Sequence, residues 1–530
     1  MIKNIKMLLL VGLAFAACTT KEDEVIAPIN SSDGLPLTAG SANFSKYVAV
    51  GNSLSAGFSD GALFMEGQKT SWTAILADQF KLVGGGNFKI PFMADNVGGF
   101  LTATGTQNFG FLPRLYFNTL AQPSPAPELV PMMSSAANST ILTGGFNNMG
   151  VPGAKVFHLL FPGYGNLNPY FGRFATSPGA SILADAKAQD ATFFSLWIGN
   201  NDVLAYATNC GEGVNRLGNP DVTQYGLTDL TDPTAFAGSY STIVNEMTAK
   251  GAKGIVANIP DVTSLPYFYV VKYNQLTQSN LTVDGVNLVN QLNTSLYGPL
   301  SGALQFLGQG SRISLLSTTG NNPMLMIDEN LTDLSAQLTQ VITGGLVQQG
   351  VDPAIAAAQG GALGAIFGKA RQTKPTDLIG LNAASRIGRA VNSAQDGVSS
   401  PVPTLNKLGV SFPLPDRYVL MPEEIPEITA ATLAFNTSIK SIADAKGLAF
   451  VDANKVLNDV NKPAGLSSNG FTVKSTYVTG GAFSLDGVHP SPRGYALIAN
   501  EFIKVINAKY GSNLKGVDLG AYRVLFPKNL

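Results

Sequence analysis

The sequence predicts an α/β protein built around a parallel β-sheet with helices on both faces. Apolar runs that are typical of buried strands lie at residues 47–50, 193–198 and 254–260, and segments with helical spacing alternate with them. Such alternation favours parallel strands joined by crossover helices, and a sheet of this kind is covered on both faces. Ligands of these sheets bind at the carboxyl ends of the strands, so the residues that follow each run are the first candidates for a functional site.

The first of these runs is followed closely by a serine. Residues 47–57 read YVAVGNSLSAG, and Gly51 allows a sharp turn where a helix can begin. Such a turn lifts the Ser53 hydroxyl clear of the sheet and directs helix amides at any charge that develops beside it. We therefore interpret Ser53 as a candidate nucleophile. A helix N-cap is the alternative role, because serine is among the preferred N-cap residues.

A second serine, Ser59, lies within a strict Gly-x-Ser-x-Gly motif at residues 57–61. This motif is the nucleophile elbow of α/β-hydrolases, which requires a strand directly before it. The apolar run ends at Val50, too far upstream to serve as that strand. The position of the run therefore favours Ser53 over Ser59.

Two further loops carry residues that can stabilise a negative charge. Residues 147–154 read NNMGVPGA, and a glycine in such a loop can bring its N–H close to a ligand oxygen. Residues 199–202, GNND, follow the run at 193–198, so Asn201 falls at the same end of the sheet as Ser53. An Asn amide donates a hydrogen bond without titrating, which suits a developing oxyanion. Ordinary turns, or a cap supplied by Asn or Asp, are the alternative for both loops.

A candidate base lies near the end of the chain. Residues 484–495 read SLDGVHPSPRGY, in which Ser491 can cap a helix that starts at Pro492 and leaves Asp486 and His489 on the loop before it. A serine hydroxyl is inert at neutral pH unless a base accepts its proton. That base needs a third group to fix its tautomer and stabilise its charged form. His489 is the candidate base and Asp486 its orienting carboxylate; roles in capping and at the surface are the alternative.

Composition excludes several other kinds of site. The other histidine, His158, lies in the apolar segment VFHLLF, which is typical of a partly buried histidine with its hydrogen bonds satisfied. A chain with only two histidines cannot form a His-rich metal site. The net charge of -1, from 34 basic and 35 acidic residues, offers no polyanion footprint and argues against a nucleic-acid partner. Cys210 is the one cysteine outside the N-terminal segment, so no intramolecular disulfide is expected in the mature protein.

The N-terminus predicts an exported protein. Lys3 and Lys6 precede an apolar run at residues 7–17, which is typical of a secretory signal and too short to span a membrane. The sequence FAAC ending at Cys18 resembles a bacterial lipobox, and the acidic residues at 19–24 resemble the tag of some outer-membrane lipoproteins. We expect a lipid anchor on Cys18, with the protein at the outer membrane and its surface. A soluble exported protein is the alternative.

Length and composition predict several structural units. A chain of 530 residues with 45% hydrophobic residues can bury large cores. The stretch at 271–414 interrupts the alternation and holds an Ala/Gly-rich run at 342–369 that can form one or two weakly amphipathic helices. It is a candidate cap or substrate-binding subdomain, or a passive decoration. The predicted order is a signal peptide (1–17), a lipidated cysteine and tether (18–42), a first core part (43–270), this mainly helical or irregular insertion (271–414), a last core part (415–515) and a tail (516–530).

Taken in order, these motifs resemble the SGNH (GDSL-type) hydrolase family over residues 43–270 and 415–510. The resemblance implies a three-layer α/β/α, flavodoxin-like sheet. It also implies that Ser53 is the nucleophile, that Gly153 and Asn201 join the Ser53 amide as oxyanion donors, and that Asp486 and His489 complete the site. Asn52 stands where the family has Asp. The family needs no cofactor.

The resemblance also implies hydrolysis of acyl or acetyl esters, which we expect at the cell surface with a small-molecule, lipid or glycan ester as substrate. In this mechanism Ser53 attacks the acyl carbonyl, His489 accepts its proton and water later releases the acyl group. A surface lipoprotein that binds a glycan or lipid without catalysis is one alternative. An acyltransferase, in which an alcohol replaces water, is another. Neither the substrate nor an oligomeric state follows from the sequence.

Overall fold

The computed structural model describes residues 34–121, 126–136, 141–278, 281–283 and 286–530. The predicted signal peptide, Cys18 and the first part of the predicted tether lie outside these ranges. Among the described residues, no helix combines the length and the apolar character needed to cross a membrane.

The core of the molecule is a five-stranded parallel sheet, which confirms the predicted α/β class. Its strands are β1 (Tyr47–Gly51), β4 (Asn148–Gly150), β5 (Phe193–Trp197), β6 (Lys253–Ala257) and β13 (Ala449–Val451), in the spatial order β13-β6-β5-β1-β4. All four pairs are parallel. Numbered along the chain, this is the order 2-1-3-4-5, one of the common doubly wound arrangements. The order reverses between β1 and β5, so a crevice is expected where these two strands end.

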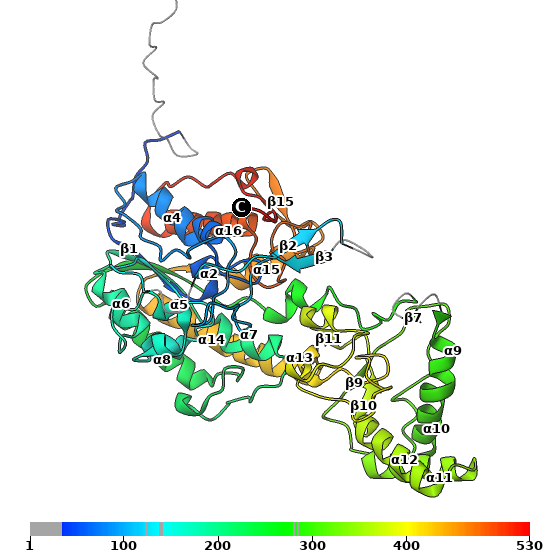
Figure 1. Cartoon of the computed structure of the whole chain (residues 1–530). Helices are drawn as coiled ribbons and strands as arrows, with labels where there is room; N and C mark the ends of the chain where they lie inside the picture. Colours follow the sequence, from blue (N-terminus) through cyan, green and yellow to red (C-terminus); the bar gives the residue numbers. More distant parts are fainter. Residues whose placement is uncertain (1–33, 122–125, 137–140, 279–280, 284–285) are drawn as a thin grey trace, which may run out of the picture.

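Helices cover both faces of the sheet, as predicted (Figure 1). On one face α4 (Trp72–Lys81) lies against α16 (Pro492–Tyr510), and the rings of Trp72 and Phe502 are 4.2 Å apart. On the other face α8 (Pro233–Thr248) lies against α14 (Ile425–Ala445), and the rings of Phe236 and Phe435 stack at 4.1 Å. These helix pairs bury the sheet, which explains why β1, β5 and β6 are mostly apolar along their whole length.

The shorter elements of the core lobe complete this arrangement. They are α2 (Ser53–Ala56), α3 (Met65–Lys69), β2 (Leu115–Asn118), β3 (Ala126–Leu129), α5 (Pro169–Gly172), α6 (Ile182–Ala188), α7 (Asn200–Thr208), α15 (Ala453–Asn461), β14 (Leu466–Ser468) and β15 (Phe471–Val473). β2 and β3 form an antiparallel hairpin, as do β14 and β15.

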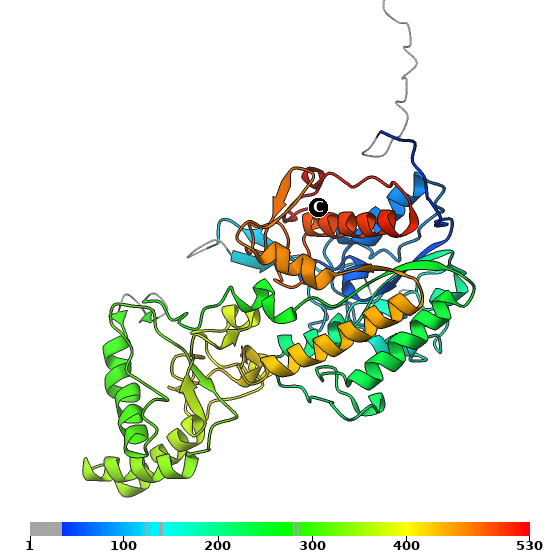
Figure 2. The same ribbon diagram turned by 180° about the vertical axis from the view of Figure 1, so that it is seen from behind.

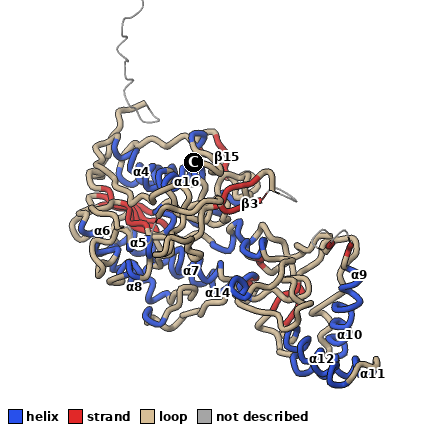
Figure 3. Tube along the Cα trace, viewed as in Figure 1, coloured by secondary structure: helices blue, strands red, loops and turns tan. Residues whose placement is uncertain are grey.

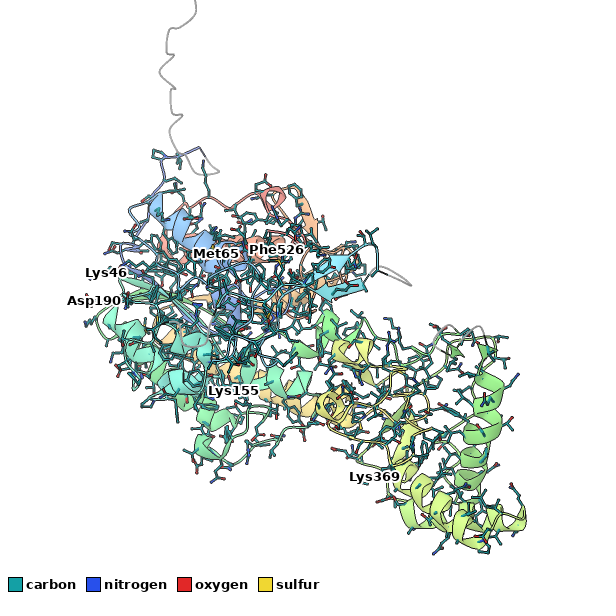
Figure 4. The ribbon with its side chains drawn as sticks, viewed as in Figure 1. Lys46, Met65, Lys155, Asp190, Lys369 and Phe526 are labelled. Carbon is teal, nitrogen blue, oxygen red and sulfur yellow. The ribbon has the colours of Figure 1, made fainter. Side chains whose placement is uncertain are left out.

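The amino ends of the strands form a charged outer edge. Asp190, just before β5, accepts from Lys46, just before β1, at 2.9 Å and from Lys250, just before β6, at 2.8 Å. Lys46 and Asp190 lie at the edge of the core lobe that points away from the rest of the molecule (Figure 4). Lys46 and Asp190 are about half exposed and Lys250 is mostly exposed, so these pairs lie on solvated surface and contribute little to stability. The candidate residues of the site lie at the opposite, carboxyl edge.

Residues 271–421 form a second lobe with its own apolar cluster, and the predicted insertion at 271–414 lies within this range. Figures 1 and 2 show it extending away from the sheet, with α11 and α12 at its far end. Figure 3 shows its strands as short pieces among loops and helices. Its elements are β7 (Thr282–Val283), β8 (Val286–Asn287), α9 (Val289–Leu292), α10 (Gly298–Phe306), β9 (Leu325–Ile327), α11 (Ser335–Gln348), α12 (Pro353–Phe367), β10 (Ala370–Gln372), β11 (Leu378–Ile379), α13 (Ser393–Asp396) and β12 (Val419–Leu420).

The Ala/Gly-rich run of this lobe forms most of an antiparallel helix pair. A Cβ placed at Gly360 would lie 2.2 Å from Thr343 Oγ1, and one at Gly364 would lie 2.2 Å from Thr339 Oγ1. Glycine at these positions of α12 therefore allows close approach to α11.

Candidate active site

Ser53 begins α2 immediately beyond the central strand β1. Asn52 is the N-cap of this helix, and its Oδ1 accepts from the Leu54 amide at 3.1 Å. Its Nδ2 donates to Oδ1 of Asn200, at the end of β5, at 3.0 Å, so it ties together the loops that follow two neighbouring strands. Ser53 itself is 5% exposed.

Gly51 is required for a reason other than the turn that the sequence suggests. It is the last residue of β1, and its φ is not in the left-handed region. A Cβ at Gly51 would lie 2.3 Å from Ser55 Oγ and 2.5 Å from the Trp197 carbonyl oxygen. Gly150 of β4 is similar, since its Cβ would lie 2.4 Å from the Ala56 amide nitrogen. Both glycines let α2 lie directly on the strand ends, which fixes where Ser53 stands.

The structure brings Ser53, His489 and Asp486 into one chain of hydrogen bonds. Ser53 Oγ lies 2.8 Å from His489 Nε2, and His489 Nδ1 lies 2.8 Å from Asp486 Oδ2. An ionised Asp486 accepts the Nδ1 proton, which leaves Nε2 as the acceptor for the serine hydroxyl. Ser53 and His489 are 436 residues apart in sequence, so the fold alone produces this contact.

Further donors hold Asp486 in place. Its Oδ1 accepts from the amides of His489 at 2.8 Å and Val488 at 2.9 Å and from Ser484 Oγ at 3.1 Å, while Oδ2 also accepts from the Gly61 amide at 3.0 Å. Burial by itself would raise the pKa of Asp486. The neighbouring His489 and these hydrogen bonds outweigh burial and hold the pKa below its usual range. Asp486 is therefore a carboxylate at neutral pH.

The two predicted oxyanion residues lie on adjacent loops at the same edge of the sheet. Gly153 follows β4 with φ of +79°, and Asn201 is in the first turn of α7. Asn201 Nδ2 donates to the Ala154 carbonyl at 2.9 Å, and Asp202 Oδ2 accepts from the Val156 amide at 2.9 Å. The first turn of α7 thus holds the loop that carries Gly153. An Asn amide has a second N–H, so Asn201 retains one donor beyond this bond.

The alternative candidates have structural partners elsewhere. Ser59 is buried, and its Oγ donates to the Pro490 carbonyl at 3.1 Å. His158 accepts from the Lys155 amide at 3.1 Å and stacks on Tyr164 with ring centroids 4.6 Å apart. Burial and the nearby Lys155 lower the pKa of His158 to about 4, so this ring is neutral at physiological pH. It is the satisfied, partly buried histidine that its sequence context suggests.

An apolar pocket opens beside Ser53 and His489. It has a volume of about 100 Å³, and side chains from the loops after β5 and β6 and from helices α15 and α16 line it. On another side, the Phe58 ring lies 4.6 Å from the His489 ring. Among the described residues, no group of three or more His, Cys, Asp and Glu is placed to hold a metal ion.

None of the family models, curated proteins or solved structures compared with this chain matches it.

Sequence reasoning missed Asp60, which holds the loop that carries Asp486. Its Oδ1 accepts from the Leu485 amide at 2.9 Å, and its own amide donates to Ser484 Oγ at 2.9 Å. Burial is the main cause that raises the pKa of Asp60 to about 7, and repulsion by Asp486 adds to it. The one available signal was an Asp within a Gly-rich turn, where Asp tolerates a positive φ; here φ is 51°.

The site contains the parts needed for nucleophilic catalysis. A serine hydroxyl is hydrogen-bonded to a histidine that a carboxylate orients, and loops with potential N–H donors lie at the same edge of the sheet. Such a set can transfer the serine proton to the ring nitrogen as the oxygen attacks an electrophilic carbon.

Proposed function

We propose that this protein is a serine hydrolase that cleaves carboxylic esters through an acyl-enzyme. The observation that carries the proposal is the hydrogen-bonded chain of Ser53, His489 and Asp486 at the carboxyl edge of the sheet. The point where the strand order reverses, between β1 and β5, is where doubly wound sheets bind ligands, and Ser53 and Asn201 follow those two strands.

In the proposed reaction Ser53 Oγ attacks the ester carbonyl carbon while His489 Nε2 takes the hydroxyl proton. Asp486 stabilises the resulting imidazolium. The oxygen of the tetrahedral intermediate accepts hydrogen bonds from the amides of Ser53 and Gly153 and from Asn201 Nδ2. His489 then donates its proton to the leaving alcohol, the carbon–oxygen bond to that alcohol breaks, and the acyl group remains on Ser53. Water then attacks the acyl carbon while His489 Nε2 accepts a water proton. The bond between the acyl carbon and Ser53 Oγ breaks, His489 returns the proton to Oγ, and the acid is released.

We further propose that the core lobe is an SGNH-type fold. The strand order 2-1-3-4-5 is that of flavodoxin-like sheets, and the four motifs follow strands or precede a helix in the order that the resemblance implies. Asn52 acts as N-cap and bridge between loops, which is compatible with its standing where the family has Asp. With Cys18 as lipid anchor, the enzyme would act at the outer membrane.

Hydrolysis of p-nitrophenyl acetate and butyrate by the chain from Thr19 tests the proposal. We expect Ser53→Ala and His489→Ala each to lower kcat by at least about 10⁴-fold, because nucleophile and base act as a unit. Ser59→Ala is the matched control: it removes a buried serine whose hydroxyl is bonded to the Pro490 carbonyl, and we expect it to keep most of the activity.

A fluorophosphonate probe gives a second readout. We expect one probe per molecule on the peptide that contains Ser53, and none in Ser53→Ala. If activity survives in Ser53→Ala and disappears in Ser59→Ala, the nucleophile is Ser59 and the proposed role of Ser53 is wrong. A folded wild-type chain that neither reacts with the probe nor hydrolyses any ester would contradict the proposal and favour a binding protein.

A further inference from the structure

The pocket beside Ser53 runs between two helices that present matching apolar faces. On α16 the lining residues are Gly494, Leu497, Ile498, Glu501 and Phe502, which follow the spacing of one helix face. At a rise of about 1.5 Å per residue, this stripe is roughly 12 Å long. The pocket is therefore elongated along α16 and begins near the His489 loop, which directly precedes this helix.

Helix α15 supplies the facing wall with the same periodicity. Ala453, Val456, Leu457 and Val460 line the pocket and occupy one face of α15 over about 10 Å. Figures 1 and 2 show α15 next to α16. Two facing apolar stripes of similar length form a groove that fits an unbranched chain.

The chemistry of the lining favours a hydrocarbon over a sugar. The polar side chains among the described lining residues are Ser53, Asn200, His489 and Glu501, and the rest are aliphatic or aromatic. Ser53 and His489 bond each other, and Asn200 bonds Asn52. Sugar hydroxyls away from Glu501 would lose water in this groove without gaining partners, which costs free energy for each unpaired group. Methylene groups gain free energy from the same burial.

We infer that this pocket binds the acyl chain of the ester substrate and that the substrates are medium-chain aliphatic acyl esters; the inference rests on the proposed function of Ser53. The acyl group stays on Ser53 while the alcohol leaves and water enters. A pocket walled mainly by buried side chains therefore suits the acyl group, and the leaving alcohol needs the open side.

The volume of the pocket sets the expected length. A group of the size of a water molecule requires roughly 10–15 Å³ of cavity volume. About 100 Å³ therefore accommodates on the order of 7–10 groups of methylene size. Each buried methylene is expected to raise kcat/KM about fourfold until the groove is full.

A series of p-nitrophenyl esters from C2 to C16 tests this assignment. We expect kcat/KM to rise to a maximum near C8–C10 and to fall beyond it. Val456→Trp and Ile498→Trp fill the groove from opposite walls at partly exposed positions. Both are expected to abolish the rise of kcat/KM beyond C4. Asn458→Trp and Lys504→Trp add the same side chain to exposed positions of the same helices and should keep the wild-type profile.

Two further measurements separate the possible failures. Ethyl octanoate and octyl acetate are isomers that place the same chain on opposite sides of the ester, and we expect the octanoate to react faster; equal or reversed rates would overturn the acyl assignment. Calorimetry with octanoate and Ser53→Ala reports on the pocket without catalysis. Binding that Val456→Trp abolishes supports the pocket even if no ester is hydrolysed. A flat chain-length profile together with no octanoate binding overturns the inference and leaves ester hydrolysis standing.

Discussion

Asp486 is positioned by more than its bond to His489. The amides of Val488 and His489 reach its Oδ1, and the Gly61 amide reaches Oδ2 from a loop more than 400 residues away in the chain. A carboxylate with this many donors is fixed in orientation and remains ionised, so it can hold the His489 ring with Nε2 directed at Ser53.

Asn201 is the side chain whose removal tests the oxyanion donors. We expect Asn201→Ala to lower kcat by about 10²–10³-fold with little change in KM, because in the proposed mechanism its second N–H bonds an oxygen that is charged only in the transition state. Steady-state kinetics on a short ester measures this effect.

Asn168→Ala is the matched control for this prediction. Asn168 Nδ2 donates to the Pro152 carbonyl at 2.8 Å, so this variant weakens the support of the Gly153 loop while Asn201 remains. If Asn201 acts only by holding the loop, the two variants should lose kcat equally. A selective loss in Asn201→Ala is expected.

The three residues of the hydrogen-bonded chain could be found in the sequence, whereas their supports could not. Ser53 follows a readable apolar run, and a chain with two histidines offers few bases, so local patterns were enough for Ser53 and His489. The hydrogen bond between Asn52 and Asn200 joins residues that are 148 positions apart in sequence, and the one between Asp60 and the Leu485 amide joins residues 425 positions apart. No local periodicity encodes such contacts, because they depend on which strands become neighbours.

At the scale of elements, the sheet was predictable where its strands are long and apolar. β1, β5 and β6 follow runs of this kind, and α16 begins at Pro492 after its Ser491 cap, as the sequence predicts. β4 consists of Asn148, Met149 and Gly150, where the sequence predicts a loop. A three-residue strand with Asn and Gly carries no strand signal, and its pairing with β1 arises from tertiary context.

The loops at 57–61 and 484–490 act as one element, and Asp60 is their main link. We expect Asp60→Ala to destabilise the fold by about 1–3 kcal/mol, because the Leu485 amide loses its acceptor. The same change should lower kcat about 10- to 100-fold by displacing the Asp486 loop. Asp60→Asn keeps an oxygen at Oδ1 and should retain the stability and the kcat of the wild type. Unfolding in urea and ester kinetics on the two variants measure this; equal effects of Ala and Asn would contradict the role given to Oδ1.

At the scale of the molecule, the two lobes meet beside the candidate site. Leu381 of the second lobe approaches Gly487, where an added Cβ would lie 3.1 Å from Leu381 Cδ2, and Arg417 pairs with Glu212 of the core lobe at 3.0 Å. The described residues that line the apolar pocket all belong to the core lobe. The second lobe therefore contacts the loop that carries Asp486 and His489 without forming the groove.

Acidic residues gather where the chain returns from the second lobe to the core. Burial is the main cause that raises the pKa of Glu424 to about 8 and that of Asp416 to about 7, and neighbouring carboxylates add to both shifts. Glu424 is 6% exposed, and its Oε2 accepts from the Met421 amide at 2.7 Å. In the folded protein these two carboxyl groups therefore keep protons that they lose in the unfolded chain above their ordinary pKa of about 4.

This proton binding makes the junction less stable as pH rises. Between about pH 4.5 and pH 8 the unfolded state binds fewer protons at Glu424 than the folded state does, so the free energy of unfolding falls with pH and levels off above pH 8. We expect a loss on the order of 1–3 kcal/mol from pH 5 to pH 8 in the wild type. Glu424→Gln, which stays neutral and keeps an acceptor for Met421, should show a flatter profile. Glu423→Gln, at the exposed neighbouring position, should follow the wild type. Urea unfolding at pH 5, 6.5 and 8 measures the three profiles, and identical slopes for Glu424→Gln and the wild type would show that Glu424 does not hold a proton at the junction.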